Sequence, residues 1–266
     1  MVRYALMGAT GATGTAILRH LLQEPPNDLS LNIYVRSKSK LLDKFSDLET
    51  RPRFQAAIFE GSNTERTLLK QCLHDVDAIM MCIATNVSTP GESRFTDTAN
   101  AVTEALLELK KEQAASYKTP SILILRASIL NPNWSGPRKG YFENFLMFCL
   151  RHLYDNMEAA NEIYETKAKE TPGLLNVIYV DPPGIHDNDG TKPTGYELLL
   201  APQGDRMPQF NLSYTDLGIA FCEIAERREE FKGKGVGVFG TGEIKLTWPI
   251  LMGHLSQGLR GRVLGW

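Results

Sequence analysis

The stretch Tyr4-Ala5-Leu6-Met7-Gly8-Ala9-Thr10-Gly11-Ala12-Thr13-Gly14 lies near the start of a chain of 266 residues. The apolar run that opens at Val2 indicates a buried strand, and the three glycines indicate a turn that leaves it. The apolar residues that follow have helical spacing: Ala16, Ile17, Leu18, Leu21 and Leu22. A strand, a glycine turn and a helix in this order place a pyrophosphate on the amides at a helix N-terminus. The sequence therefore predicts a dinucleotide site here.

The end of the next expected strand indicates which dinucleotide is bound. Leu31-Asn32-Ile33-Tyr34-Val35 is followed by Arg36-Ser37-Lys38, about 20 residues past the last glycine. An acidic residue at this point binds the ribose 2′-hydroxyl of NAD, whereas an arginine fits a 2′-phosphate. Arg36 offers a fork of donors suited to phosphate, and Lys38 and Lys40 add positive charge. We therefore expect NADPH rather than NADH, with a solvated basic loop as the alternative.

Apolar runs and helical patterns alternate along the rest of the chain. Further strands are expected at residues 54–59, 77–83, 121–125 and 174–180, and helices at 40–48, 64–73, 98–111 and between 141 and 169. Thr64 is the expected N-cap of the second of these helices. Continuous apolar strands alternating with helices indicate a parallel sheet covered on both faces. We expect an α/β fold with a Rossmann-like, doubly wound sheet of strand order 3-2-1-4-5-6.

The domain organisation follows from chain length and from a change of pattern near the C-terminus. A chain of 266 residues with 42% hydrophobic side chains can bury one substantial core, so residues 1–266 are expected to form a single Rossmann-type domain. From Asp181 to Phe210 the sequence becomes rich in Pro, Gly and Asp. Residues 130–150, 182–211 and 241–266 are expected to contribute a small substrate-side cap, which would exclude water from the site.

Bulk properties exclude several classes of protein. A formal net charge of −2 argues against a nucleic-acid partner, which requires a strong basic excess. No apolar run approaches the ~20 residues that span a bilayer, and the chain starts directly in an expected core strand without room for a signal peptide. The four cysteines are widely spaced and form no cluster with histidine. We expect a cytoplasmic protein with a small-molecule substrate and no metal, and oligomeric state is left open.

Several motifs occur in a characteristic order along the chain: Gly8-x-x-Gly11-x-x-Gly14, Val35-Arg36-Ser37-Lys38, Ala84-Thr85-Asn86, Pro183-Gly184 and Tyr214-Thr215-Asp216-Leu217-Gly218. Together they resemble an atypical short-chain dehydrogenase/reductase, with the NmrA-like branch as the nearest match. The resemblance covers nearly the whole chain. It implies nucleotide contacts from Gly8, Thr10, Gly11, Ala12, Thr13 and Arg36. It also implies that Ala84, Thr85 and Asn86 lie along the ribose and that Pro183 and Gly184 lie beside the nicotinamide.

The sequence departs from that family at the catalytic residues. Ordinary members reduce carbonyls with a Tyr-x-x-x-Lys pair, whose tyrosine protonates the developing alkoxide. The sequence has this spacing only at Tyr34 and Lys38, at the end of a strand, where it has no catalytic meaning. Tyr164 lies on the expected helix, with Lys167 one residue too early; residues three apart share a helix face, so a partial substitute is conceivable. A packing role for Tyr164 and a solvated Lys167 form the alternative.

Two charged residues follow the fifth and sixth expected strands. Arg126 and Asp181 would lie at the ends of adjacent strands near the nicotinamide, and charges at this depth are costly unless paired. An ionised Asp181 would stabilise an iminium cation that receives a hydride, and Arg126 would lower the pKa of that carboxyl. A similar arginine and aspartate occur in reductases of fungal indole alkaloid assembly, where the pocket can steer a [4+2] cycloaddition. The pair therefore suggests an NADPH-dependent reductase or reductive cyclase for a cationic metabolite; a structural ion pair is the alternative.

Two other functions remain open. A non-catalytic redox sensor would bind NADP(H) and signal through protein contacts, which agrees with the missing Tyr-x-x-x-Lys pair. A carbonyl reductase or isomerase would use Tyr164, Tyr141 or water as its acid. The first would show no turnover, and the second would lose its rate when the tyrosine is replaced by phenylalanine.

Overall fold

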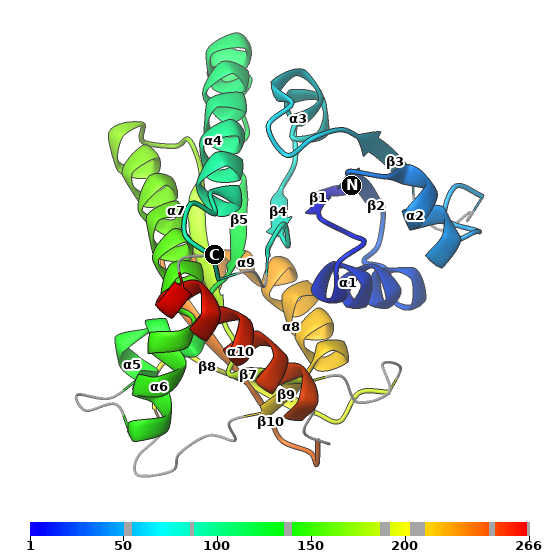
Figure 1. The fold of residues 1–266 in the computed structure, drawn as a ribbon. Coiled ribbons are helices and arrows are strands. Elements are labelled where there is room, and N and C mark those ends of the chain that lie inside the picture. Colours follow the sequence, from blue (N-terminus) through cyan, green and yellow to red (C-terminus); the bar gives the residue numbers. More distant parts are fainter. Residues whose placement is uncertain are drawn as a thin grey trace.

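A mostly parallel sheet forms the centre of the molecule (Figure 1). The computed structural model describes residues 1–50, 55–85, 88–135, 140–186, 192–202, 211–244 and 248–264. Among them, eight strands form this sheet: β1 (Val2–Met7), β2 (Leu29–Val35), β3 (Gln55–Glu60), β4 (Ala78–Met81), β5 (Ser121–Leu125), β6 (Asn176–Asp181), β8 (Tyr196–Leu199) and β10 (Gly235–Gly240). Their order is β3-β2-β1-β4-β5-β6-β10-β8, and only β8 pairs antiparallel. The predicted order 3-2-1-4-5-6 is confirmed, and two strands extend it.

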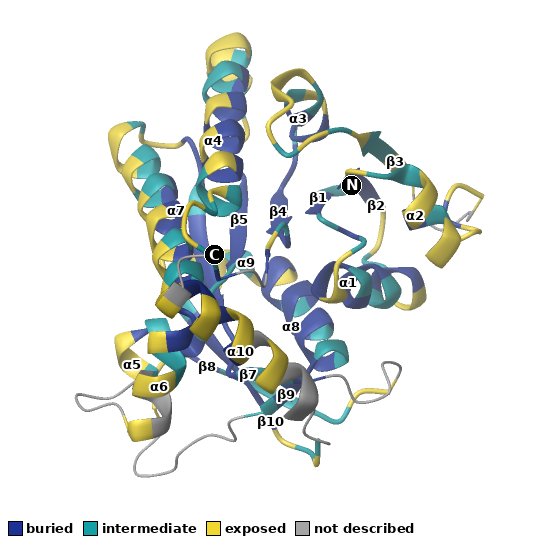
Figure 2. Cartoon of the chain, viewed as in Figure 1, coloured by how far each residue is buried: buried dark blue, intermediate teal, exposed yellow. Residues whose placement is uncertain are grey.

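Helices cover both faces of the sheet. On one face α1 (Ala12–Gln23) lies against α8 (Tyr214–Glu226), and on the other α4 (Arg94–Gln113) lies between α3 (Arg66–Cys72) and α7 (Arg151–Glu170). Successive side chains of a strand enter different cores, so that Leu6 belongs to the first and Met7 to the second. The central strands are therefore buried on both sides (Figure 2).

The C-terminal part of the chain adds a smaller layer. Here α10 (Trp248–Leu264) packs against α6 (Tyr141–Cys149) and α7, while β7 (Gly184–His186) pairs in parallel with β9 (Asn211–Ser213). Of these elements, α6, α10 and β7 come from the stretches predicted to form the cap, whereas α7 and most of β9 lie outside them. The segment Tyr196–Leu199 belongs to the same stretches but forms β8 at the edge of the main sheet. The remaining short elements are α2 (Lys38–Lys44), α5 (Pro132–Ser135), α9 (Arg228–Phe231) and the 3-10 helices η1 (Ala114–Ser116) and η2 (Ser128–Leu130).

Two local features differ from the expectation. The helix expected from Thr64 begins at Arg66 with Glu65 at the N-cap position, so the assignment of Thr64 as the cap was wrong. Its hydroxyl lies 3.2 Å from that of Ser62 instead. The strand β10 was not predicted, because its sequence contains three glycines, which are uncommon in strands.

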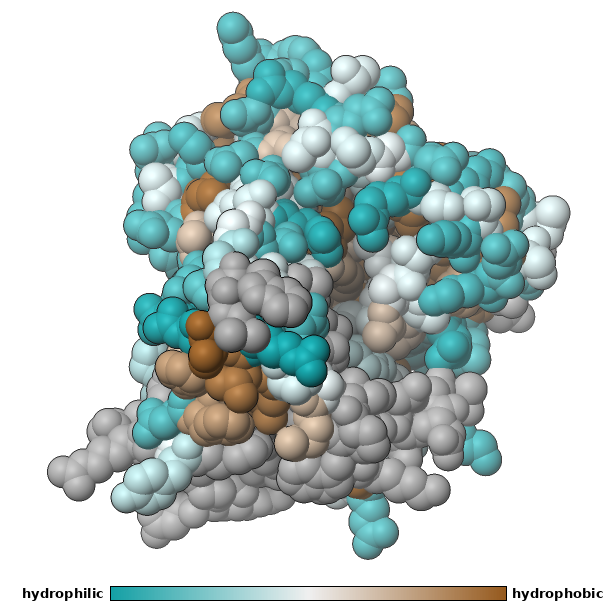
Figure 3. Space-filling model, in the orientation of Figure 1, coloured by the Kyte–Doolittle hydropathy of each residue, from teal (hydrophilic) through white to brown (hydrophobic). Residues whose placement is uncertain are grey.

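The surface near the C-terminus is partly apolar. Exposed apolar side chains gather on α6 and α10 (Figure 3): Phe145, Phe148, Met252, Leu259 and Val263. No helix in the described part of the chain has both the length and the apolar character needed to cross a bilayer.

Candidate cofactor site and active site

The glycine turn between β1 and α1 is shaped by close backbone approaches. Gly8 has φ +89°, and a Cβ there would lie 2.8 Å from the carbonyl oxygen of Cys82. A Cβ on Gly14 would collide with the carbonyl oxygen of Gly8, so both positions require glycine. The N-cap of α1 is Gly11, and its first turn has no acidic residue. The amides of this turn are therefore suited to an anionic phosphate.

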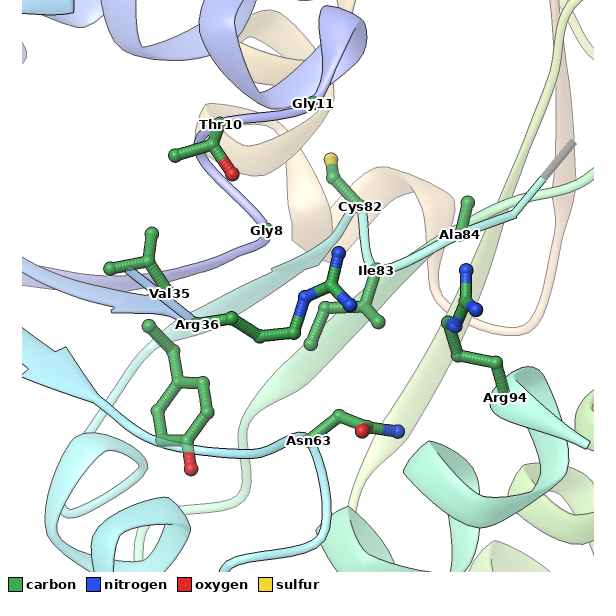
Figure 4. A pocket seen from close by; sticks show the side chains of 11 residues that line it. Gly8, Thr10, Gly11, Val35, Arg36, Asn63, Cys82, Ile83, Ala84 and Arg94 are labelled. Atoms are coloured by element: carbon green, nitrogen blue, oxygen red, sulfur yellow. The ribbon is translucent and has the colours of Figure 1, made fainter. Parts of the chain in front are cut away.

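A cavity of about 210 Å³ opens beside this turn (Figure 4). It is formed by the carboxyl ends of β1, β2 and β4, as expected for a ligand site in an open α/β sheet. The residues that line it are Gly8, Thr10, Gly11, Tyr34, Val35, Arg36, Asn63, Cys82, Ile83, Ala84 and Arg94. Arg36 is exposed and has no hydrogen-bond or ion-pair partner among the described residues. Two arginine side chains and no carboxylate thus face this cavity within the described part of the chain.

The structure brings together only some of the predicted cofactor residues. Gly8, Thr10, Gly11, Arg36 and Ala84 line the cavity. Ala12 and Thr13 lie in the first turn of α1, and Thr85 is buried after β4. Pro183 and Gly184 lie at the start of β7, away from this lining, and Asn86 lies outside the described residues. Lys38 pairs with Glu49, with Nζ 2.7 Å from the carboxylate, so its charge is engaged outside the cavity.

Sequence reasoning missed two polar residues of the lining. Asn63 follows β3 by three positions, and its amide donates to the hydroxyl of Thr98 at 2.8 Å. Polar residues after a parallel strand are a usable signal, because such strand ends meet at one edge of the sheet. Arg94 begins α4 and reaches the cavity from another element, and nothing in its sequence context marks it.

The expected contact between Arg126 and Asp181 is present. The guanidinium donates through Nε and Nη2 to the two carboxylate oxygens, each at 2.7 Å, and the Asn131 amide donates to Oδ2 at 2.6 Å. Asp181 is fully buried, and Arg126 stacks 4.0 Å above the ring centre of Tyr179. Each carboxylate oxygen therefore already accepts at least one charge-assisted or amide hydrogen bond.

The pKa of the Asp181 carboxyl is raised by burial, while the hydrogen bonds from Arg126 and Asn131 act in the opposite direction. We expected Arg126 to lower this pKa; its effect has that sign, but desolvation outweighs it. Neither residue is among those that line the cofactor cavity. The catalytic role of the pair stays a prediction.

The two predicted tyrosines occupy opposite environments. Tyr141 at the start of α6 is 99% exposed and lines neither of the two cavities described here, so its catalytic role stays a prediction. Tyr164 is 2% exposed and lines a second, small cavity of about 30 Å³ between α4 and α7. Burial raises the pKa of its phenol above the ordinary value, so it stays protonated at neutral pH. Lys167 instead pairs with Glu170 at 3.0 Å.

The second cavity adjoins the cofactor cavity. Its walls are mainly apolar and come from β4, β5, α4 and α7: Met81, Ile83, Ala84, Ile124, Leu125, Phe95, Met157 and Ala160. Two of these residues, Ile83 and Ala84, also line the cofactor cavity. Asn161 was not predicted as a site residue, but its side chain lines this cavity beside Tyr164.

The fold and the phosphate-binding turn define a dinucleotide-binding protein of the Rossmann type. A short-chain dehydrogenase/reductase of Veillonella parvula has the same fold, with a TM-score of 0.64, 14% sequence identity and coverage of 92% of this chain and 96% of that one. The family model described as NAD(P)H-binding matches residues 8–226. The chain therefore belongs to this NAD(P)H-binding family.

Relatives with higher identity narrow the assignment. Averufin oxidase A of Dothistroma septosporum is 45% identical over 267 residues, which cover 100% of this chain and 93% of that protein. Averufin oxidase A of Aspergillus flavus is 41% identical over 263 residues, with 99% and 91% covered. The chain is thus an NAD(P)H-dependent oxidoreductase similar to enzymes of fungal secondary metabolism. Averufin is a polyketide and not an alkaloid, so the expected alkaloid pathway and coupled cyclisation find no support.

Proposed function

We propose that the chain is an NADPH-dependent oxidoreductase that transfers a hydride between the cofactor and averufin or a closely related polyketide. The choice of NADPH rests on Arg36, whose guanidinium faces the cavity at the end of β2 and has no partner among the described residues. The relatives named averufin oxidase support the substrate class. Within the family, we place the chain in the NmrA-like branch on the motifs quoted above.

The preference for NADPH rests on the charges around the adenosine end of the cavity. A 2′-phosphate needs donors or positive charge, whereas a free 2′-hydroxyl is recognised by a carboxylate. Arg36 supplies a planar fork of donors after β2. Arg94 lies across the cavity at the start of α4, where its Nη2 is 3.8 Å from Oε2 of Glu92 (Figure 4). No carboxylate lines the cavity among the described residues. This arrangement favours the phosphorylated cofactor.

A neutral substrate suits the site better than the iminium ion considered from the sequence. The charge of Asp181 is already compensated by the Arg126 guanidinium, and its two oxygens accept three hydrogen bonds in a fully buried environment. The pair therefore offers little net negative charge to a cation. Hydride transfer to a carbonyl carbon leaves an alkoxide that takes up a proton, whereas hydride transfer from an alcohol carbon releases one. The protonated phenol of Tyr164 beside Ala84 is the group we assign to proton donation in the reductive direction.

The cofactor assignment is tested by replacing Arg36 and measuring the affinities for NADPH and NADH separately. We expect Arg36→Ala to raise the Kd for NADPH roughly 10- to 100-fold, the range for a lost hydrogen bond to a charged group, and to leave that for NADH unchanged. Lys38→Ala is the matched control, because that lysine already pairs with Glu49. Equal losses for both cofactors, or an unchanged Kd for NADPH, would contradict the assignment.

Turnover is tested with averufin and either NADP+ or NADPH, by following the absorbance of the reduced nicotinamide. A change that depends on averufin supports the proposed oxidoreductase. Tight binding of NADPH without any turnover would instead favour the redox sensor.

A further inference from the structure

Two largely buried polar side chains of α7 make no hydrogen bond to another described residue. Asn161 is 8% exposed, and its Oδ1 is buried and accepts no hydrogen bond. Tyr164 is 2% exposed; its hydroxyl makes no hydrogen bond to a described residue, but it is not fully enclosed as Oδ1 of Asn161 is. A buried polar atom without a partner, such as this Oδ1, costs about 1–3 kcal/mol and is uncommon in folded proteins. This cost has a simple explanation if a ligand supplies the missing partner.

The two side chains face the same space. Residues three apart lie on one face of a helix, and both line the second cavity, whose volume is about 30 Å³. A space of this size holds one polar group of about the size of a water molecule, since a single water needs roughly 10–15 Å³. The hydroxyl of Thr98, the other polar side chain of the lining, already donates to the Arg94 carbonyl and accepts from Asn63.

The second cavity lies next to the cofactor cavity. Ile83 and Ala84, which follow β4, line both cavities. The hydrogen bond from Asn63 to Thr98 joins a residue of the first lining to one of the second. A dinucleotide whose phosphates lie at the glycine turn would therefore pass Ala84, which also lines the cavity of Asn161 and Tyr164.

We propose that Asn161 and Tyr164 form a hydroxyl-binding subsite that is completed only when the cofactor or the substrate is bound. An amide and a phenol each donate and accept, which matches a neutral hydroxyl. No cationic side chain is among the described residues of this lining, so a carboxylate or phosphate would lack a counter-charge. The hydroxyl belongs either to the ribose of the nicotinamide half of NADPH or to the substrate, and the inference rests on the proposed function in this respect.

The test replaces Asn161 by leucine, which has similar volume but no polar atoms, and measures stability and ligand binding together. Without ligand, we expect Asn161→Leu to raise the midpoint of thermal unfolding, because the unsatisfied amide is removed. The matched control is Asn156→Leu on the same helix. The amide of Asn156 accepts from the backbone N–H of Phe95 and donates to the hydroxyl of Thr96, so its loss should lower the midpoint.

Binding of NADPH and of 2′,5′-ADP, which lacks the nicotinamide ribose, identifies the source of the hydroxyl. If the ribose occupies the subsite, Asn161→Leu raises the Kd for NADPH about five-fold and leaves that for 2′,5′-ADP unchanged. If the substrate occupies it, the Kd for NADPH is unchanged and the KM for averufin rises by a similar factor.

Other outcomes overturn the inference. An Asn161→Leu variant with a lowered midpoint, or with unchanged affinity for both NADPH and averufin, would mean that the cavity holds only water. A wild-type protein that binds neither NADPH nor 2′,5′-ADP would instead overturn the proposed function, so the two failures are distinguishable.

Discussion

Two buried polar clusters lie on the same side of the sheet, and they differ in whether their hydrogen-bonding groups are satisfied. In the first, Asp181 accepts from Arg126 and Asn131, and every carboxylate oxygen has a donor. In the second, Asn161 and Tyr164 face a small cavity. There, Oδ1 of Asn161 is buried without a hydrogen-bond partner, and the hydroxyl of Tyr164 makes no hydrogen bond to a described residue. Tyr179, which stacks under Arg126, and Tyr164 belong to the same hydrophobic core, so the surroundings are comparable.

A cluster whose hydrogen-bonding groups are all satisfied suits a structural role, whereas a cluster with unsatisfied groups suits the binding of a ligand. A fully satisfied buried network fixes the elements that carry it, here the ends of β5 and β6 and the segment after η2. A polar group without a hydrogen-bond partner does not stabilise the free protein. It contributes favourably only when a ligand supplies that partner. The sequence predicts Arg126 and Asp181 as the reactive pair, and that role stays a prediction; the proposed function assigns proton donation to Tyr164 of the second cluster. Three substitutions test the contrast.

The largest loss of stability is expected when the ion pair of Arg126 and Asp181 is broken. Arg126→Met leaves the Asp181 carboxylate buried without its main partner, which typically costs about 3–5 kcal/mol in the free energy of unfolding. Urea denaturation measures this loss. The double variant Arg126→Met with Asp181→Leu is the control, because removing both charges should recover most of the stability.

A different result would restore the catalytic hypothesis. If Asp181→Asn unfolds like the wild type, binds NADPH normally and yet abolishes turnover with averufin, then the carboxylate acts on the reacting atoms.

An intermediate loss of stability is expected when a larger side chain is introduced beside Arg126, Asp181 and Asn131. A Cβ on Gly235 would lie 2.5 Å from Nη2 of Arg126, 2.6 Å from Oδ2 of Asp181 and 2.8 Å from Nδ2 of Asn131. Gly235→Ala should therefore cost about 1–3 kcal/mol, as overpacking of a filled interior does. Gly253→Ala on α10 is the control, since a Cβ there meets nothing within 4 Å. Equal stabilities of the two variants, by urea denaturation, would show that the cluster tolerates displacement.

Much of the fold could be predicted because its signals are local. Continuous apolar strands and the glycine turn after β1 give the sheet order, and the cavity lies where an open α/β sheet predicts it. The strand β10 escaped prediction because the reasons for its glycines are tertiary: Gly235 faces the Arg126 cluster, and a Cβ on Gly237 would lie 2.6 Å from the Trp134 ring.

The active site was less predictable than the fold. The contact of Arg126 with Asp181 follows from two neighbouring strand ends, but the sequence does not reveal that Asn131 completes their network. Asn161 looks like any polar residue of an amphipathic helix. Its importance depends on a missing partner, and a missing partner is visible only once the packing around α7 is known.

The smallest effect on stability is expected from substitution of Tyr164, which tests the contrast between the two clusters most directly. Because its hydroxyl has no partner in the described structure, Tyr164→Phe should leave the free energy of unfolding unchanged or raise it slightly. Tyr117→Phe is the matched control: its hydroxyl donates to the Leu174 carbonyl at 2.7 Å, and the loss of this bond should cost about 1 kcal/mol. Urea denaturation of both variants gives the two values. A cost at Tyr164 as large as that at Tyr117 would mean that the phenol is already satisfied in the free protein, and the contrast between the two clusters would then disappear.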